Sequence, residues 1–362
     1  MTNIQAGTNA ASVQFENVTK VYGKDVTAVD NVSIHVQAGE LVTLLGPSGC
    51  GKTTTLRMIA GLEMATSGQI IIGDTDVTAL PATDRDVSMV FQSYALFPHM
   101  SVIDNVSYGL RMNNLKKDEV RDRANRGLDL VGLNGYGGRL PNELSGGQQQ
   151  RVAVARALVL EPQVLLFDEP LSNLDAKLRR QVREDIRDIQ TSLGLTVVYV
   201  THDQEEALAV SDRIIVMNNA TIAQIGTPRE LYDTPKDEFV ADFIGEANLF
   251  DGRVESVENN EGGRVATVAV DQLRFQVADG NHPEGAVRVA IRPGRIRIMP
   301  AKTPNTMAGT ILKATYAGSH IEFKVATSVG ELFVVADVES EFSPGDSVGV
   351  GFAKKGPVLI AV

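Results

Sequence analysis

Four things are scarce or missing in this sequence. Cys50 is the one cysteine among 362 residues, so no disulfide can form within the chain, as is typical of proteins in a reducing compartment. No run approaches the ~18 uninterrupted apolar residues of a membrane-spanning helix. The opening residues, MTNIQAGTNAA, lack the basic start and apolar stretch of a secretory signal. If the protein works at a membrane, other chains must hold it there.

A basic excess is also missing. The formal net charge is −11, whereas proteins that bind nucleic-acid phosphates usually carry a positive surplus, so we expect no nucleic-acid partner. The composition is otherwise that of a globular protein with a sizeable core, since 43% of residues are hydrophobic and 22% charged. The length favours two domains or one large one. We predict a flexible tail over residues 1–11, an α/β domain over 12–245 and an all-β domain over 246–362.

The pattern of apolar residues supports this division. Residues 12–38 alternate as antiparallel strands do, and then short apolar runs (LVTLL, VLLFD, TVVYV and RIIVM) alternate with helical segments. Such runs are typical of strands buried on both faces of a parallel sheet. Residues 93–160 contain helical segments and no convincing strand, which indicates a helical insertion. TPRELYD and DEFVADFIG (residues 227–233 and 237–245) are predicted as the closing helices of this domain.

Beyond Gly245 the texture changes to short alternating segments separated by Gly, Asn, Asp and Pro. This spacing indicates a small β-barrel or sandwich.

The segment GPSGCGKT, between a predicted strand and a predicted helix, matches the phosphate-loop pattern G-x-x-x-x-G-K-[ST]. Its glycines allow backbone N–H groups to surround phosphates, aided by the helix dipole. Lys52 supplies a cation to the terminal phosphates, and the Thr53 hydroxyl can bind Mg²⁺. The alternative is a glycine-rich turn without a ligand. The predicted ATP-binding residues here are Gly46, Pro47, Ser48, Gly49, Cys50, Gly51, Lys52, Thr53 and Thr54.

Two further predicted strands end in residues that carry chemistry. VLLFDE places Asp168 and Glu169 at the end of one strand, and TVVYVTHD places His202 at the end of another. Asp168 suits the Mg²⁺ shell, and Glu169 could polarise a water for attack on the γ-phosphate. Two capping carboxylates and a structural histidine are the alternatives. Because ligands of open α/β sheets bind at the carboxyl edge, we expect these groups to converge there.

A second glycine turn opens a helix at residues 142–158. Ser145 is a suitable N-cap with Gln148 three residues later, and an apolar stripe follows. Glycines at a helix start let N–H groups approach an anion closely. The chain therefore has two glycine turns suited to anion binding but only one nucleotide-binding motif.

The phosphate loop, LSGGQ (144–148), VLLFDE (164–169), LSNLD (171–175) and THD (201–203) occur in the order found in ABC-transporter ATPases, which this chain resembles over essentially its whole length. The resemblance implies a P-loop ATPase that uses ATP and Mg²⁺. It also implies a head-to-tail homodimer, in which each ATP lies between one chain's phosphate loop and the other chain's signature turn. That turn comprises Ser145, Gly146, Gly147 and Gln148.

Other roles come from the same resemblance. Tyr22 matches the aromatic that stacks on adenine, although a strand-end tyrosine can also belong to a core. Gln92 matches the glutamine that senses Mg²⁺ and the attacking water, and Asp175 matches the aspartate that links the two sites of the dimer. The implied catalytic residues are Glu169, His202 and Gln92. The implied Mg²⁺ ligands are Thr53, Gln92 and, through water, Asp168.

The segment after Gln92, SYALFPHMSVIDNV, is too apolar for a free loop and too irregular for a regular helix or strand. An exposed apolar patch often marks a binding surface, and the resemblance supplies a partner, a cytoplasmic helix of the membrane-spanning subunits. Core packing beneath the helical insertion is the alternative. The residues concerned are Tyr94, Leu96, Phe97, Pro98 and Met100.

The β-rich tail narrows the resemblance to ATPases of bacterial importers for maltose, glycerol phosphate, polyamines, sulfate and ferric iron, whose regulatory domain is oligonucleotide-fold-like (TOBE). VRVAIRP is similar to a segment of that domain, although Gly294 replaces the usual glutamate. The chain is most similar in appearance to the ferric-iron ATPases, with phosphonate and polyamine ATPases next. The implied protein is peripheral on the cytoplasmic face of the inner membrane, with two permease subunits and, indirectly, a periplasmic or lipid-anchored solute-binding protein.

Other protein classes fit less well. A soluble ATPase of DNA repair or chromosome packing would separate its two nucleotide motifs by a long coiled coil, and no sustained heptad run occurs. Exporter chains commonly carry membrane spans, and translation-associated members carry two ATPase copies. A protein that holds ATP without turnover would not need Glu169 and His202.

Overall fold

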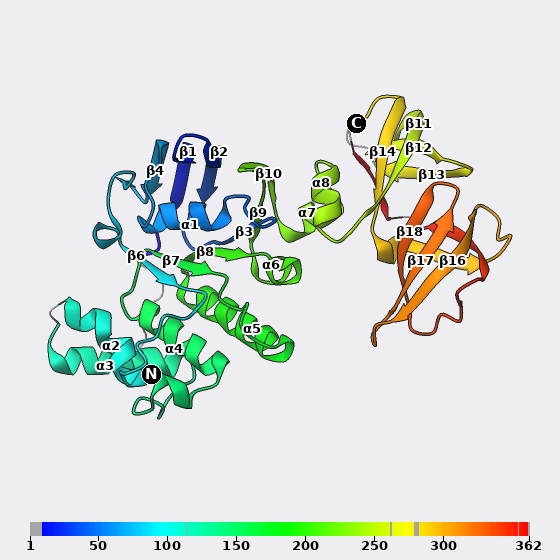
Figure 1. Ribbon diagram of the computed structural model, residues 1–362. Coiled ribbons are helices and arrows are strands. Elements are labelled where there is room, and N and C mark those ends of the chain that lie inside the picture. Colours follow the sequence, from blue (N-terminus) through cyan, green and yellow to red (C-terminus); the bar gives the residue numbers. More distant parts are fainter. Residues whose placement is uncertain (1–8, 114, 261–262, 279–281, 354, 361–362) are drawn as a thin grey trace. The chain divides into compact units, whose positions relative to one another are not determined.

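The computed structural model describes residues 9–113, 115–260, 263–278, 282–353 and 355–360. The chain divides into two compact units, Met1–Pro228 and Arg229–Val362 (Figure 1). Most of the predicted tail, residues 1–8, lies outside the described residues. The rest of it is bonded to the first unit, since the Asn9 amide donates to Asp86 and the Ala11 N–H donates to the Gln163 carbonyl.

A six-stranded sheet forms the centre of the first unit, with the strand order β10-β9-β3-β8-β7-β6. All neighbouring pairs are parallel except β10 with β9, which is antiparallel. The strands are β3 (Leu41–Leu45), β6 (Val87–Val90), β7 (Val164–Asp168), β8 (Thr196–Thr201), β9 (Arg213–Asn218) and β10 (Thr221–Gly226). The predicted parallel α/β sheet is confirmed.

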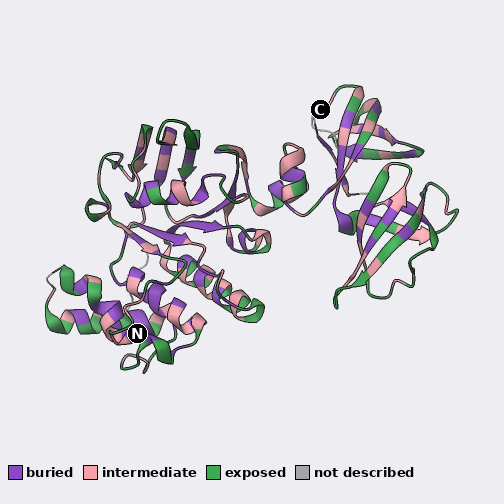
Figure 2. Ribbon diagram, in the orientation of Figure 1, coloured by how far each residue is buried: buried purple, intermediate pink, exposed green. Residues whose placement is uncertain are grey.

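The central strands β3, β7 and β8 are buried on both faces, which explains why they read as continuous apolar runs (Figure 2). Along β7, Leu165 and Phe167 point into one hydrophobic cluster, while Val164 and Leu166 point into the other. Helix α1 (Lys52–Ala60) packs into the second cluster. Helices α4 (Gly146–Leu158) and α5 (Ala176–Leu193) pack into the first cluster, so they lie on the opposite face of the sheet from α1.

A small antiparallel sheet covers α1. Its strand order is β2-β1-β4-β5, and its inward side chains, such as Phe15 and Ile70, belong to the same cluster as Leu56 of α1. The strands are β1 (Val13–Tyr22), β2 (Val26–Val36), β4 (Ser67–Ile72) and β5 (Thr75–Asp76), and a short helix, η1 (Ala82–Asp84), precedes β6. β1 and β2 are the antiparallel strands that the sequence predicts.

Between β6 and β7, the described residues form the helices α2 (Val102–Met112), α3 (Lys117–Leu130) and α4, with a short helix η2 (Pro141–Glu143) before α4. They share the hydrophobic cluster on the α4 face of the sheet. The sequence predicts α3 and α4 but not α2, which begins inside the segment interpreted as irregular. Ser101 caps α2 by accepting from the Asp104 N–H. The pattern Ser-x-x-Asp at 101–104 is a helix-start signal that the apolar residues before it obscure.

Helix α6 (Gln204–Val210) lies between β8 and β9 in the first unit. No helix in the described part of the chain combines the length and apolar character that a membrane span requires.

The second unit is mainly β, as the sequence predicts. Two five-stranded antiparallel sheets, β13-β12-β11-β14-β20 and β15-β19-β16-β17-β18, contribute side chains to one shared hydrophobic cluster. Their strands are β11 (Asn248–Asn260), β12 (Gly263–Val270), β13 (Leu273–Ala278), β14 (Gly285–Ile291), β15 (Ile296–Pro300), β16 (Met307–Tyr316), β17 (Ile321–Thr327), β18 (Gly330–Ala336), β19 (Ser347–Phe352) and β20 (Pro357–Ile360), with η3 (Pro293–Arg295) after β14.

Helices α7 (Pro228–Asp233) and α8 (Glu238–Phe243) pack with this second unit. The sequence prediction assigns them to the first domain and places the boundary at Gly245. Two arginines of the β-rich part explain the difference: Arg292 donates to the carbonyls of Tyr232 and Ala241, and Arg288 pairs with Glu238. The local sequence pattern of the two helices could not predict these contacts, because the helix residues and the arginines lie 50 or more residues apart in the sequence.

Asp212 ties the sheet of the first unit to α5. Its carboxylate accepts from the Leu41 N–H at 2.9 Å and from Arg187 at 2.6 and 3.0 Å. Partial burial opposes ionisation, but the hydrogen bonds from Arg187 and Leu41 outweigh it and lower the pKa of Asp212 below its ordinary value of 3.8. A lowered pKa means that this stabilisation is present above pH 3.8 and is lost as the pH falls through the folded-state pKa.

We therefore expect Asp212→Asn to lower the free energy of unfolding by about 1–2 kcal/mol at neutral pH, as for a half-exposed charged hydrogen bond. The deficit relative to wild type should shrink as the pH falls toward the folded-state pKa, because the wild-type carboxyl then also loses its charge. Urea unfolding at pH 7 and at about pH 3 measures both values, with Asp25→Asn in the exposed turn after β1 as the control. An equal deficit at both pH values would contradict the assignment.

Candidate functional site

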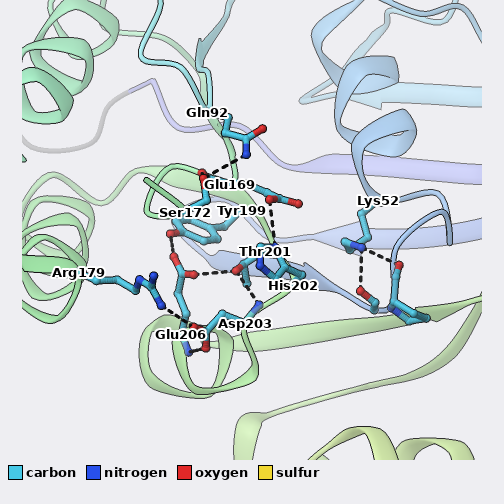
Figure 3. Close-up of polar contacts among 12 residues, drawn as sticks. Lys52, Gln92, Glu169, Ser172, Arg179, Tyr199, Thr201, His202, Asp203 and Glu206 are labelled. Atoms are coloured by element: carbon cyan, nitrogen blue, oxygen red, sulfur yellow. Dashed lines mark hydrogen bonds and ion pairs between the residues drawn. The ribbon is translucent and has the colours of Figure 1, made fainter. Parts of the chain in front are cut away.

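The carboxyl ends of four neighbouring parallel strands carry the predicted site residues. The phosphate loop follows β3, His202 follows β8, Asp168 and Glu169 lie at the end of β7, and Gln92 lies just beyond β6. Because parallel strands point the same way, these segments emerge at one edge of the sheet. Figure 3 shows the labelled side chains gathered there.

Two glycines of the phosphate loop are required by close contacts. A Cβ on Gly46 would lie 2.3 Å from the Met217 carbonyl oxygen of β9, and a Cβ on Gly51 would lie 2.3 Å from the Ala28 carbonyl oxygen of β2. Gly51 also has a φ of 105°, which side chains disfavour. The loop is therefore pressed between β9 and β2, which fixes its course above the start of α1.

Lys52 is a buried cation held by neutral groups. Its Nζ donates to the carbonyl oxygens of Gly46 at 2.8 Å and Pro47 at 2.9 Å and lies 3.8 Å from Cys50 Sγ (Figure 3). In the part of the chain that the structure describes, no carboxylate lies within ion-pair distance of Lys52. A buried ammonium that faces only carbonyls is well suited to an incoming anion. Thr53 and Thr54 follow it, half-buried, in the first turn of α1.

The two acids at the end of β7 have different environments. Burial raises the pKa of Asp168, the charge of Arg57 opposes that shift, and the nearby Glu169 carboxylate adds to it. Glu169 has a left-handed backbone (φ 45°), an uncommon conformation for a residue other than glycine, and its N–H donates to the Val200 carbonyl. This turns its side chain toward β8, where Glu169 Oε2 lies 3.0 Å from His202 Nδ1 (Figure 3).

The loop after β7 contacts Gln92 twice. Gln92 Nε2 donates to Ser172 Oγ at 3.2 Å, and Asn173 Nδ2 donates to the Gln92 carbonyl at 2.9 Å. Asp175, at the end of this loop, caps α5 by accepting from the Leu178 N–H. Ser172 and Asn173 are not among the predicted site residues, because their partner lies 80 residues or more earlier in the chain.

The signature turn is not on the same face of the sheet as the helix of the phosphate loop. Ser145 and Gln148 form a reciprocal cap at the start of α4, with Ser145 N–H to Gln148 Oε1 at 2.9 Å. A Cβ on Gly146 would lie 3.1 Å from the Leu174 side chain, and one on Gly147 would lie 2.7 Å from Leu178. These glycines therefore also serve close packing against the loop before α5 and the start of that helix.

Tyr22 ends β1 and is 37% exposed. The Lys20 ammonium lies 4.8 Å from the centroid of its ring, a cation–π contact. The adjacent strand β2 presses against Gly51, so Tyr22 belongs to a hairpin that borders the phosphate loop. Its exposure excludes the alternative of a fully buried core tyrosine.

The apolar segment at residues 94–100 is held in an irregular course by two side chains. Buried Asn105 bonds to backbone groups of Phe97, Met100 and Ser101, and Arg156 donates to the carbonyls of Tyr94 and Ala95. Tyr94 is buried, in agreement with the core interpretation. Leu96, Phe97 and Met100 are half-buried and Pro98 is exposed, so part of the segment remains accessible.

The oxygen donors near the phosphate loop fit a magnesium ion held mainly by a nucleotide. The described residues contain no cluster of three or more His, Cys, Asp or Glu side chains arranged for a metal. Mg²⁺ in phosphoryl-transfer sites instead takes one or two protein oxygens, substrate phosphates and waters. A threonine hydroxyl in the first turn of α1, the Asp168 carboxylate and the Gln92 amide are donors of this kind.

Comparisons with known proteins agree with this geometry. The family described as "ABC transporter" matches residues 29–172, and "TOBE domain" matches residues 289–360. Proteins named Fe(3+) ions import ATP-binding protein FbpC from Rhizobium etli, Brucella abortus and Vibrio cholerae are 58%, 56% and 49% identical to this chain. The alignments cover 96%, 99% and 89% of this chain and 97%, 99% and 90% of theirs.

Solved structures agree as well. The dimeric post-hydrolysis state of the ATP-binding cassette MJ0796 with ADP and Pi is 34% identical, with a TM-score of 0.54, over 60% of this chain and 99% of that one. Clostridium perfringens cbiO1, part of the ABC transporter complex cbiONQ, is 27% identical, with a TM-score of 0.57, over 63% of this chain and 91% of that one. The predicted fold class, with a P-loop ATPase domain and a TOBE domain, is confirmed.

We expect Lys52→Ala to weaken ATP binding by about 100-fold or more, because it removes the buried cation that faces the phosphates. Calorimetric titration of the purified chain with ATP measures the affinity, and thermal unfolding checks that the variant is folded. Lys117→Ala, an exposed lysine of α3, is the matched control and should bind like wild type. Near-normal affinity of Lys52→Ala would show that the phosphate cradle lies elsewhere.

Proposed function

This chain belongs to the ABC transporter family, and on that premise we propose that it is the ATP-hydrolysing subunit of a bacterial ferric-iron importer. The observation that carries the proposal is the shared sheet edge, where the phosphate loop, Asp168 and the Glu169–His202 pair meet. The relatives aligned over nearly the whole chain supply the cargo.

The residues at this edge divide the work of phosphoryl transfer. Lys52 and the loop N–H groups bind the β- and γ-phosphates, and Tyr22 stacks on the adenine. Thr53, Gln92 and, through water, Asp168 would hold Mg²⁺, which when bound would neutralise charge on the phosphates. Glu169 orients and deprotonates the attacking water, and His202, whose ring is 60% exposed, contacts the γ-phosphate.

The active unit is a homodimer that encloses two ATP molecules. Within one chain, α4 packs on the opposite face of the sheet from α1, so the two glycine turns start helices in separate layers. In a head-to-tail dimer, Ser145, Gly146, Gly147 and Gln148 of one copy close over the nucleotide of the other. Cassette dimers known for MJ0796 support this arrangement. Asp175 lies at the start of α5, where it would link the two sites.

The dimer acts on two membrane-spanning permease subunits at the cytoplasmic face of the inner membrane. The accessible part of the segment at residues 94–100 is a suitable contact for a permease helix, because Asn105 of α2 and Arg156 of α4 hold its backbone in place shortly after Gln92. ATP-driven closure would then move the permease, and product release would reset it. A solute-binding protein would deliver the cargo.

Cargo does not enter the ATP site, so no residue of that site reports it. Ferric iron is proposed from the names of the relatives. A polyamine, phosphonate, sugar or sulfate is the alternative for the same machinery, and a soluble ATPase without transport is the less favoured alternative.

The dimer proposal predicts the behaviour of two variants. Glu169→Gln should bind ATP without turnover and accumulate as an ATP-bound dimer, because the base is lost while the phosphate contacts remain. Adding Ser145→Arg to this variant should abolish the dimer while leaving ATP affinity unchanged, since the arginine would occupy the space of the partner's nucleotide. Size-exclusion chromatography with light scattering, with and without ATP, measures the pairing.

Ser192→Arg in the same Glu169→Gln background is the control, because Ser192 is an exposed serine near the end of α5. It should still pair. Normal pairing of the Ser145→Arg variant would show that the signature turn does not act on the partner's ATP.

The cargo proposal predicts a selective transport defect. Deletion of the gene should reduce energy-dependent uptake of radiolabelled ferric iron, and the wild-type gene should restore it while the Lys52→Ala gene should not. Uptake of labelled polyamine, phosphonate, sugar and sulfate is measured in the same strains. Unchanged iron uptake combined with loss of one of these would replace iron as the cargo, and no change in any would favour the soluble ATPase.

A further inference from the structure

One stretch of the chain, residues 171–179, contacts three parts of the site. Ser172 and Asn173 bond to Gln92, and Leu174 and Leu178 pack against Gly146 and Gly147. Arg179, at the first turn of α5, reaches the loop that carries His202. We call residues 171–175 the dimer-linking loop, because Asp175 holds the position that joins the two sites of the dimer.

Arg179 bridges this loop and the histidine loop. Its Nη2 donates to the Leu174 carbonyl at 3.2 Å. Its Nη1 donates to Asp203 Oδ2 at 3.2 Å (Figure 3). Its Nε is buried and, among the residues that the structure describes, has no hydrogen-bond acceptor. The guanidinium is therefore held by one hydrogen bond to each loop. Because the guanidinium is planar, these hydrogen bonds have defined directions.

Asp203 links Arg179 to the backbone around His202 through further hydrogen bonds. Asp203 Oδ1 accepts from the Glu206 N–H at 3.0 Å and caps α6, and the Asp203 N–H donates to Thr201 Oγ1 at 3.0 Å. Thr201 in turn donates to the buried Glu206 carboxyl, which Tyr199 also contacts. His202 stands between Thr201 and Asp203, so both of its neighbours are held by the same network.

The His202 side chain itself is lightly held. It is 60% exposed, and its ring contacts the Glu169 carboxylate through Nδ1. Its aim at the nucleotide therefore depends on the backbone of residues 201–203. A displacement of the dimer-linking loop would reach that backbone through Arg179.

We propose that Arg179 is a positioning residue that couples the dimer-linking loop to the histidine loop, so that His202 is aligned for hydrolysis when a second copy seats that loop. The proposal rests on the proposed ATPase function and on the paired arrangement. Arg179 touches neither ATP nor the attacking water. Its role is to make the rate of the chemical step depend on a loop at the dimer interface.

The test uses Arg179→Ala, Arg179→Lys, Asp203→Asn and the double variant Arg179→Ala/Asp203→Asn in the full chain. The asparagine side chain in Asp203→Asn keeps an oxygen to cap α6 and removes the charged acceptor of Arg179. We expect kcat for ATP hydrolysis to fall about 10- to 100-fold in Arg179→Ala and in Asp203→Asn, as for small misalignments of a reacting group. KM for ATP should stay within about twofold, since no phosphate contact is lost.

The double variant should be no slower than the slower single variant, because both remove the same link. In the Glu169→Gln background, Arg179→Ala should still form the ATP-bound dimer. Arg179→Lys should recover part of kcat by keeping one donor, and Arg180→Ala, at a neighbouring position, should behave like wild type.

Three results would overturn the proposal: an unchanged kcat in both single variants, losses that multiply in the double variant, or a fall in kcat that matches lower ATP affinity and lower Tm. If Arg179→Ala does not fold, Asp203→Asn and Arg179→Lys decide the same question. Absence of hydrolysis by the wild-type chain would overturn the proposed function and this inference with it. Normal wild-type hydrolysis with multiplicative losses would remove the Arg179 link alone.

Discussion

The site depends on the parallel pairing of β3, β8, β7 and β6. Each strand is four to six residues long and packs against side chains on both faces, so its register is set by two hydrophobic clusters at once. A one-residue slip of β7 would exchange Leu165 and Phe167 with Val164 and Leu166 between the clusters. The same slip would move Glu169 away from His202. The core packing therefore fixes the relative positions of the proposed catalytic groups along the strand direction.

The same two-sided burial explains why one copy of the chain cannot complete the proposed site. Helix α1 and the phosphate loop belong to the layer covered by the small antiparallel sheet, whereas α4 and its signature turn belong to the helical layer on the opposite face. Burial of both faces leaves no path by which the turn could fold over its own nucleotide. In the proposed dimer, a second copy would present that turn from outside.

The parts of the site that the sequence predicts are those with local signals. A phosphate loop, a strand that ends in two acids and a serine cap each occupy fewer than about ten consecutive residues, and their backbone geometry follows from nearby glycines and caps. The parts that it misses rest on side chains that reach far along the chain. Arg292 binds Tyr232 across 60 residues and draws α7 and α8 into the second unit, and Asn173 binds Gln92 across 81. Helix α2 escapes prediction for a local reason, since apolar residues precede its cap.

The Arg179–Asp203 pair shows why a directional contact suits this position. Both side chains are about one-third exposed, at 34% and 29%, so the ion pair itself contributes little to stability. An apolar contact would stabilise the two loops as well, but it would allow them to slide. A planar guanidinium with one acceptor on each loop changes its hydrogen-bond angles when either loop moves, so it would transmit such a movement in the proposed coupling to His202. Behind Asp203, burial raises the pKa of Glu206, whereas the hydrogen bonds from Tyr199 and Thr201 and the charge of Arg179 act in the opposite direction. In the proposed role, Arg179 would pass a displacement of the dimer-linking loop to the hydrogen-bonded residues on either side of His202.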